Sequence, residues 1–135
     1  MSKKNVPTAR SVTVACRGIR GATTAEANTA AAIGKATKEL LRELVKANDL
    51  KPDQIAAAIF STTHDLNAAF PATTARLMGW THVALMSTNE MDVPEALKRC
   101  IRVLLLVNTD KKQDEVQFVY LKEAVALRNQ SAATS

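Results

Sequence analysis

Arginines occupy positions where the sequence pattern predicts secondary structure to begin or end. Arg102 precedes the apolar run VLLLV at 103–107, although a guanidinium stays charged in a protein and its unpaired burial costs several kcal/mol. Either a negative group meets Arg102 there, or the strand begins one residue later than it looks. Arg17 and Arg20 lie in the glycine-rich stretch RGIRG, which we expect to form a tight strand-to-helix connection.

Three further polar side chains lie on or just after predicted elements. Glu90 follows a strand, Tyr120 lies on the last main strand, and Arg76 lies on a short helix. If they converge with Arg20 and Arg102, the pocket holds several guanidiniums, one carboxylate, one phenol and no base poised near neutral pH. Such a site suits a dianionic, carboxylate-bearing small molecule. It favours a reaction driven by charge stabilisation and conformational restraint over hydrolysis or redox chemistry, because nothing in it activates water or carries electrons.

Three of these residues also have a plainer interpretation. Arg17 and Arg20 would be solvent-facing loop charges, and Tyr120 would be a core residue with its hydroxyl at the surface. The RGIRG stretch matches neither G-x-x-x-x-G-K-[ST] nor G-x-G-x-x-G, so it supports nucleotide binding only weakly.

The histidines and cysteines give no sign of a metal site or of a catalytic nucleophile. His64 is expected in a solvated loop and His82 at a strand edge, without metal-ligand spacing between them. Cys16 and Cys100 are far apart and form no C-x-x-C motif, which predicts reduced, buried thiols. The sequence therefore predicts neither a metal nor a cofactor.

The 135 residues suit one domain, and 47% hydrophobic residues can supply its core. The low aromatic content of 4% disfavours an RNA-binding sheet with stacking rings. The net charge of +5 falls to +2 without Lys3, Lys4 and Arg10, so the basic excess belongs largely to the first ten residues and nucleic acid is not the expected partner. No apolar run is long enough to span a bilayer and no signal peptide is evident, so we expect the cytoplasm.

Hydrophobic periodicity predicts an alternation of strands and helices. A T-x-x-E capping box at Thr23 and Glu26 predicts the start of a long helix, and Pro71 and Gly79 bound a short one. The predicted helices span about 25–47 and 71–78, and the predicted strands span 11–16, 55–63, 82–89, 101–109 and 116–122.

This order predicts the α/β (α+β) class, with a single mixed sheet, one long helix and one short helix. The helices would cover mainly one face of the sheet, so the other face needs an oligomeric partner. We expect a domain at 11–128, between flexible tails at 1–10 and 129–135.

Five blocks in register, RGIRGATT, DLNAAFPA, NEMDV, CIRV and VYL, resemble the monofunctional bacterial chorismate mutases of the trimeric α/β type. The resemblance runs from about Val14 to Arg128. It implies a pseudo-barrel homotrimer with an active site in each cleft between neighbouring subunits. It also implies conversion of chorismate to prephenate by a Claisen rearrangement, without cofactor, metal or covalent intermediate, on the way to phenylalanine and tyrosine.

The resemblance further implies roles for four residues. Arg102 would contact the ether oxygen, where negative charge grows as the C–O bond breaks, and Arg20 would bind a substrate carboxylate. Glu90 would accept a hydrogen bond from the ring hydroxyl, and Tyr120 would bond the side-chain carboxylate.

Other matched positions would complete the cleft. Phe70, Ala72 and Arg76 would come from the neighbouring subunit; Leu85, Met86 and Leu127 would form walls; and Arg128 would help attract the dianion. Two positions depart from the pattern of some members. Thr73 replaces a lysine at the cleft mouth, which would weaken substrate capture, and Ser87 replaces a cysteine beside the ring hydroxyl, with little expected loss.

Two other functions remain open from the sequence. One is a trimeric metabolite sensor, which has no evident use for Glu90 beside an anionic ligand. The other is a basic nucleic-acid-associated protein, which would depend on residues 1–10.

Overall fold

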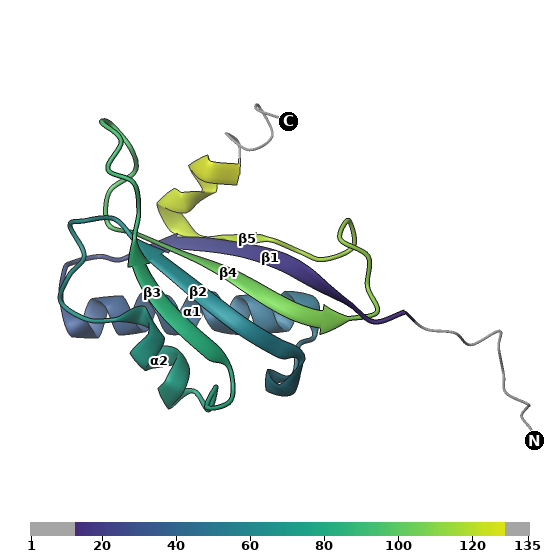
Figure 1. The fold of residues 1–135 in the computed structure, drawn as a ribbon. Helices are drawn as coiled ribbons and strands as arrows, with labels where there is room; N and C mark the ends of the chain where they lie inside the picture. The colour runs from purple at the N-terminus through teal and green to yellow at the C-terminus, as the bar shows by residue number, and fades with distance from the viewer. Residues whose placement is uncertain (1–12, 129–135) are drawn as a thin grey trace, which may run out of the picture.

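The computed structural model describes residues 13–128, which form one five-stranded sheet with helices (Figure 1). The predicted tails at 1–10 and 129–135 lie outside the described residues. The elements are β1 (Ala15–Thr24), α1 (Ala30–Asn48), β2 (Ile55–Thr62), α2 (Pro71–Leu77), β3 (Ala84–Asn89), β4 (Cys100–Thr109) and β5 (Val119–Tyr120), with 3₁₀ turns at Pro52–Gln54 and Lys122–Ala124. Within 13–128, no helix is both long and apolar enough to cross a membrane.

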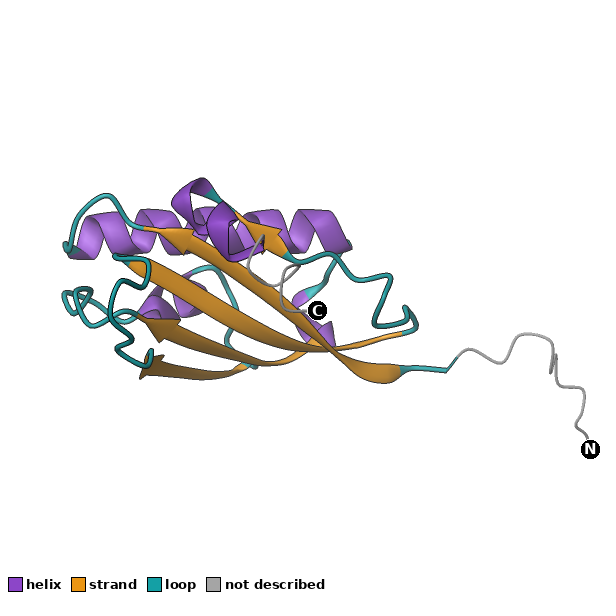
Figure 2. Cartoon of the chain, turned by 90° about the horizontal axis from the view of Figure 1, so that it is seen from above, coloured by secondary structure: helices purple, strands orange, loops and turns teal. Residues whose placement is uncertain are grey.

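The sheet has the order β3-β2-β4-β1-β5 and is mixed, as the sequence predicts. Strand β4 pairs antiparallel with β1 and with β2, whereas the outer pairs β2–β3 and β1–β5 are parallel. Helices α1 and α2 lie against one face, and the C-terminal helical segment lies on the other (Figure 1). Viewed from above, the strands fan across one another, as in a twisted sheet (Figure 2).

Alternation along β4 gives the sheet two different faces. Ile101, Val103, Leu105 and Val107 are buried, and Val103, Leu105 and Val107 belong to the same core as the leucines of α1. The residues between them point to the opposite surface, which we call the open face. The open face carries Arg20 and Ala22 of β1, Ile59 and Ser61 of β2, Met86 of β3, Arg102 and Leu104 of β4, and Tyr120 of β5.

Strand β1 corrects the prediction for the N-terminal region. The RGIRG stretch does not end the strand but lies inside it, because β1 pairs with β4 from Ala15 to Thr24 without interruption. Gly21 lies directly beneath α1, where an added Cβ would come 2.7 Å from Leu44 Cδ1. This glycine therefore serves the close approach of a helix rather than a turn.

The predicted capping box is wrong for the same reason. Thr23 is a buried residue of β1, so it cannot cap a helix. Helix α1 begins instead at Ala30, where the hydroxyl of Thr29 accepts a hydrogen bond from the Ala32 amide at 3.0 Å.

The last strand is shorter than predicted. Only Val119 and Tyr120 pair with β1, because the side chain of the buried Asn48 forms hydrogen bonds with the backbone of Gln117. The Gln117 amide donates to Asn48 Oδ1 at 2.7 Å, and Asn48 Nδ2 donates to the Gln117 carbonyl at 2.9 Å. The predictions for β2, α2, β3 and β4 are confirmed to within two residues at each end.

The two glycines of β1 should respond differently to substitution. Gly21→Ala forces a methyl group against Leu44, so we expect the free energy of unfolding to fall by about 1–3 kcal/mol. Gly18→Ala is the matched control, since its Cβ would meet only Leu104 Cδ1 at 3.5 Å, and we expect a change below about 1 kcal/mol. Urea unfolding at equal protein concentration measures both. Equal losses in the two variants would contradict this packing.

Candidate active site

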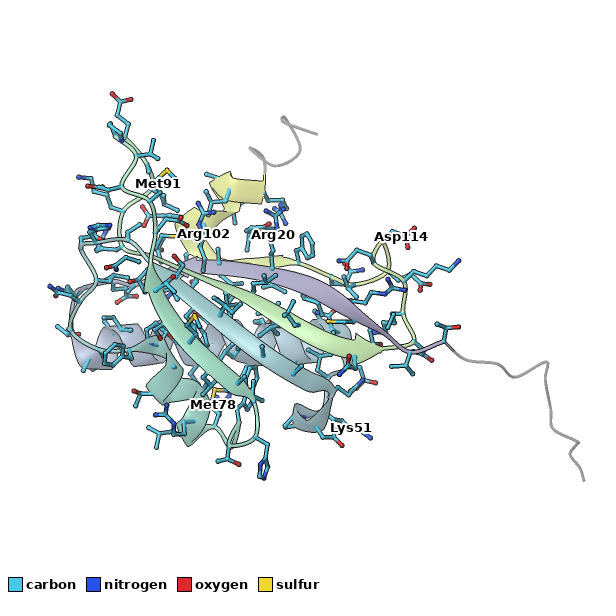
Figure 3. The ribbon with its side chains drawn as sticks, viewed as in Figure 1. Arg20, Lys51, Met78, Met91, Arg102 and Asp114 are labelled. Carbon is cyan, nitrogen blue, oxygen red and sulfur yellow. The ribbon has the colours of Figure 1, made fainter. Side chains whose placement is uncertain are left out.

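A hollow of about 350 Å³ lies on the open face, between strands β1 and β4 and the C-terminal segment. It brings together four of the predicted site residues, Arg20, Arg102, Tyr120 and Leu127, and Figure 3 shows Arg20 and Arg102 rising from the same side of the sheet. The remaining lining residues are Gly21, Ala22, Ile59, Ser61, Val103 and Leu104.

Sheet register places these side chains in one row. Ala22 pairs with Arg102 on one side and with Tyr120 on the other, so the guanidinium and the phenol flank a small residue. Adjacent strands lie about 4.8 Å apart, which separates Arg102 and Tyr120 by roughly 10 Å at the backbone. Arg20 lies opposite Leu104, in the next row of the open face. The small side chain of Ala22 leaves the space between the two polar groups.

A negative group does meet Arg102. Its Nε lies 3.1 Å from Glu90 Oε2, and the two side chains are 45% and 32% exposed. Glu90 stands just beyond β3, and its amide donates to the carbonyl of Thr62 at 2.8 Å. The alternative, a strand that begins later than the sequence suggests, is wrong, because β4 already begins at Cys100. The Arg102 side chain is therefore only partly buried, because it lies on the open face.

Arg20 lies on a strand, and both sequence interpretations that placed it in a loop are wrong. Its guanidinium carbon lies 5.1 Å from the centre of the Phe118 ring, a cation–π distance. Arg17 points to the helix side of β1, opposite Val107, and its Nε donates to the Lys111 carbonyl at 2.9 Å. Of these two arginines, only Arg20 lines the hollow.

Most of the remaining predicted site residues lie outside this hollow. Phe70 precedes α2 and is 69% exposed, Ala72 is buried, and Thr73 and Arg76 are exposed on the same helix. These four residues, which we call the α2 group, lie on the helix-covered side of the sheet, across from Arg102 (Figure 1).

The predicted wall residues are also divided. Leu85 packs against the core on the helix side, whereas Met86 is exposed on the open face. The buried Ser87 hydroxyl has no hydrogen-bond partner within the described part of the chain, and Ser87 and Phe70 line a second hollow of about 370 Å³. Arg128 is exposed beside Leu127.

Cys100 is a contact of the site that the sequence analysis missed. It is 2% exposed and packs with Ala22 and Ala124, with Tyr120 and Leu127 beside them. Burial raises the pKa of its thiol, although the charge of Arg102 acts in the opposite direction. Strand alternation would have revealed it, because residues 100 and 102 lie on the same face.

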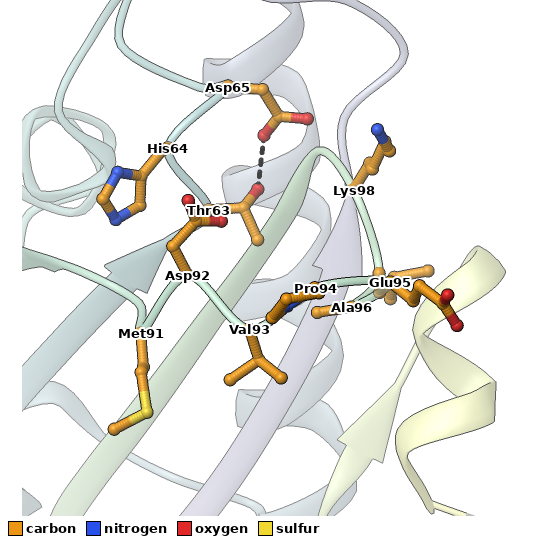
Figure 4. A pocket seen from close by; sticks show the side chains of 11 residues that line it. Thr63, His64, Asp65, Met91, Asp92, Val93, Pro94, Glu95, Ala96 and Lys98 are labelled. Atoms are coloured by element: carbon orange, nitrogen blue, oxygen red, sulfur yellow. Dashed lines mark hydrogen bonds between the residues drawn. The ribbon is translucent and has the colours of Figure 1, made fainter.

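A further hollow of about 340 Å³ lies at the loop that connects Glu90 to β4 (Figure 4). It is lined by residues 63–65 and 91–98. Partial burial opposes ionisation of Asp65, but hydrogen bonds from the Thr63 hydroxyl and the Arg99 amide outweigh it and lower the pKa of this carboxyl. Within residues 13–128, no group of three or more His, Cys, Asp or Glu side chains could hold a metal ion.

Two guanidiniums and a phenol therefore line a hollow on the open face of a mixed sheet, and the Glu90 carboxylate pairs with one of the guanidiniums. This fold and this set of side chains define an α/β protein with a site whose chemistry suits a small anion.

Comparison with known proteins identifies the family. Residues 16–131 match the family model described as chorismate mutase type I, and the chain belongs to that family. The chain is thus a chorismate mutase, an isomerase, and the resemblance inferred from the sequence is confirmed.

Individual relatives are similar over most of their length. The chain is 52% identical to chorismate mutase AroH of Thermus thermophilus, over 83% of this chain and 93% of that protein. It is 46% identical to chorismate mutase AroH of Bacillus subtilis (strain 168), over 83% and 89%. A solved chorismate mutase from Clostridium thermocellum superposes with a TM-score of 0.80 at 51% identity, covering 81% of this chain and 97% of that one.

The thiol beneath the hollow should be unreactive. The thiolate is the nucleophile, and the raised pKa and burial of Cys100 keep it scarce. In a Cys16→Ser variant, we therefore expect no labelling by a disulfide reagent at pH 8 until denaturant is added, when one thiol per chain reacts. Labelling of the native variant as fast as a free thiol would show that Cys100 is accessible.

Proposed function

We propose that the hollow on the open face is where this chorismate mutase rearranges chorismate to prephenate. The observation that carries the proposal is the Arg102–Glu90 pair, half-exposed and beside Arg20 and Tyr120. In the rearrangement one C–O bond breaks and one C–C bond forms within the same molecule, so no proton, water or electron is exchanged. The enzyme then needs only to hold the reactive conformer and to stabilise charge.

Arg102 is the residue that stabilises the transition state. As the C–O bond breaks, negative charge grows on the ether oxygen, and a preorganised cation there is worth more in the transition state than in the ground state. The Nε–H of Arg102 is taken by Glu90, which leaves the terminal Nη groups as donors to the substrate.

Glu90 has two tasks in this mechanism. Its Oε2 pairs with Arg102, and its Oε1 accepts from the Met91 amide at 3.0 Å, so the carboxylate is held at both oxygens. A carboxylate oxygen accepts more than one hydrogen bond, so the ring hydroxyl of chorismate can still donate to it. Arg20 binds a substrate carboxylate, and Tyr120 donates a hydrogen bond to the side-chain carboxylate.

The α2 group completes the site from a second copy of the chain. The sheet separates these residues from the hollow of their own chain, so they reach a hollow only if it belongs to a neighbouring subunit. The exposed apolar side chains of the open face, Leu104 and Met86 among them, support such an assembly. We propose the homotrimer of the family, a pseudo-barrel with three shared sites.

Two positions distinguish this chain within that scheme. Ser87 lies on the helix side beside Phe70, so its hydroxyl, which has no partner within residues 13–128, would meet a substrate held in a neighbouring subunit's hollow. Thr73 leaves the mouth of the site without the lysine found in some relatives, so capture of the dianion rests more heavily on Arg76 and Arg128. We further propose that the enzyme works in the cytoplasm, with neither nucleic acid nor a membrane as partner.

Substitution of Arg102 should lower turnover strongly while the fold persists. We expect Arg102→Ala to reduce kcat by about 10²–10³, the usual cost of removing one preorganised donor. Arg102→Lys should also be costly, because lysine lacks the planar fork. Loss of chorismate absorbance in the ultraviolet measures the rate, with Arg42→Ala on the exposed side of α1 as control. Near-normal turnover of Arg102→Ala would refute the assignment of the central cation.

Shared sites predict complementation between variants. Arg102→Ala and Arg76→Ala should each lower kcat/KM, and sedimentation should show trimers of both. When the two are unfolded together and refolded, roughly a quarter of the sites in randomly mixed trimers combine an intact Arg102 with an intact Arg76. Activity should rise to about that share of the wild-type value. No gain over the separately refolded variants would exclude sites shared in this way.

A further inference from the structure

Four consecutive residues at the end of β2 contact both chain segments that carry the Arg102–Glu90 pair. Residues 62–65, which we call segment 62–65, follow one another where β2 leaves the sheet. Glu90 lies just after β3, and Arg102 lies near the start of β4, so the loop 91–99 separates them along the chain. Segment 62–65 lies at both ends of that loop.

Two residues of the segment hold Glu90 by its backbone. The Glu90 amide donates to the carbonyl of Thr62 at 2.8 Å. The Nε2 of His64 lies 3.0 Å from the Glu90 carbonyl, to which it donates as its Nε2–H tautomer. Both polar groups of the Glu90 backbone are therefore bonded to this one segment.

The other two residues hold the entry into β4. The Thr63 amide donates to the Cys100 carbonyl at 3.1 Å, and the Thr63 hydroxyl accepts from the Cys100 amide at 3.0 Å. The Asp65 carboxylate accepts from the Arg99 amide with both oxygens, at 2.9 and 3.2 Å. The Thr63 hydroxyl also donates to Asp65 Oδ1 at 2.5 Å, as Figure 4 shows, so the two side chains act as one unit.

The backbone at this point needs such support. Arg99 has a φ of 50° and Glu95 has a φ of 66°, both in the left-handed region that L residues seldom adopt. The doubly accepting carboxylate of Asp65 stabilises Arg99 in that conformation. Asp65 therefore fixes the backbone conformation at Arg99, three residues before Arg102, where the chain enters β4.

The ion pair cannot supply this order by itself. Pairs as exposed as Arg102 and Glu90 contribute roughly 0–1 kcal/mol once the entropy lost in fixing two long side chains is included, which is too little to hold both side chains in place. Catalysis by a preorganised cation nevertheless requires that its position be fixed before the reaction. The order must come from the backbone contacts on either side of the pair.

We propose that segment 62–65 is a positioning element, in which Thr63, His64 and Asp65 set the Arg102–Glu90 geometry without touching the substrate. The inference rests on the proposed function of that pair. It predicts that activity depends on hydrogen bonds made outside the hollow, by residues that do not contact the substrate.

Thr63 offers the sharpest test, because its hydroxyl both donates and accepts. Thr63→Val keeps the shape and removes both bonds, and we expect kcat to fall by about 10- to 100-fold, with KM changing much less, as misplacement of a catalytic group implies. Thr63→Ser should rescue most of the activity. Thr109→Val is the matched control. The Thr109 hydroxyl accepts a hydrogen bond from the Lys111 amide at the far end of β4, away from the ion pair. This substitution should lower the melting temperature without lowering kcat.

A double-mutant cycle separates positioning from stability. In an Arg102→Lys background the geometry is already lost, so Thr63→Val should lower kcat much less than in the wild-type chain. The same fold-loss in both backgrounds, or an equal loss in Thr109→Val, would overturn the proposal and leave segment 62–65 with a stabilising role only.

A spectroscopic measurement keeps this test independent of the reaction. In protein with ¹⁵N-labelled arginine, the Nε–H signal of Arg102, assigned by its loss in Arg102→Lys, reports the contact with Glu90. We expect faster solvent exchange of this proton in Thr63→Val and Asp65→Ala, and a wild-type signal in Thr109→Val. An unchanged signal refutes the positioning role even if the enzyme is active. A changed signal in a chain that does not convert chorismate supports the positioning and refutes the proposed function instead.

Discussion

Strand β4 pairs along its length with β1 on one side and with β2 on the other, and the rest of the structure depends on this double pairing. Since alternate residues of a strand point to opposite faces, the register fixes which side chains meet the helices and which reach the open face. A shift of one residue would turn the Arg102 side chain toward the core and the Val103 side chain toward the open face. The same pairing keeps β1 extended across Gly18 and Gly21. As a result Gly21 lies under α1 and Arg20 lines the hollow.

The charges of the open face contribute little to the stability of the isolated chain. The Arg102–Glu90 pair is half-exposed, and such pairs add roughly 1 kcal/mol or less. In the proposed trimer, substrate and a neighbouring subunit would displace water and strengthen this ion pair, because the effective dielectric constant then falls. Under that proposal, the polar groups interact weakly in the isolated chain and strongly in the occupied site. Segment 62–65 keeps that arrangement in place with backbone hydrogen bonds that do not depend on occupancy.

Much of the fold could be predicted from local pattern. The apolar runs of β2 and β4, and the Pro71 and Gly79 that bound α2, act over a few residues, and these predictions hold. The predicted end of the first strand at RGIRG is wrong because glycine weakens a strand locally, whereas ten residues of pairing with β4 outweigh that preference. The capping box failed likewise, since Thr23 satisfies the same pattern as a helix cap but is a buried strand residue.

The sequence by itself determined the class of fold, the family, and the residues with the right chemistry, because composition, alternation and motif order are all properties of neighbouring positions. Only the tertiary structure decided how those residues meet. The ion pair between Arg102 and Glu90, and the contacts of Thr63 and Asp65 with the start of β4, join segments that are distant along the chain. Such contacts arise from sheet register and loop geometry, which depend on the sum of many pairings, and no short stretch of sequence specifies them.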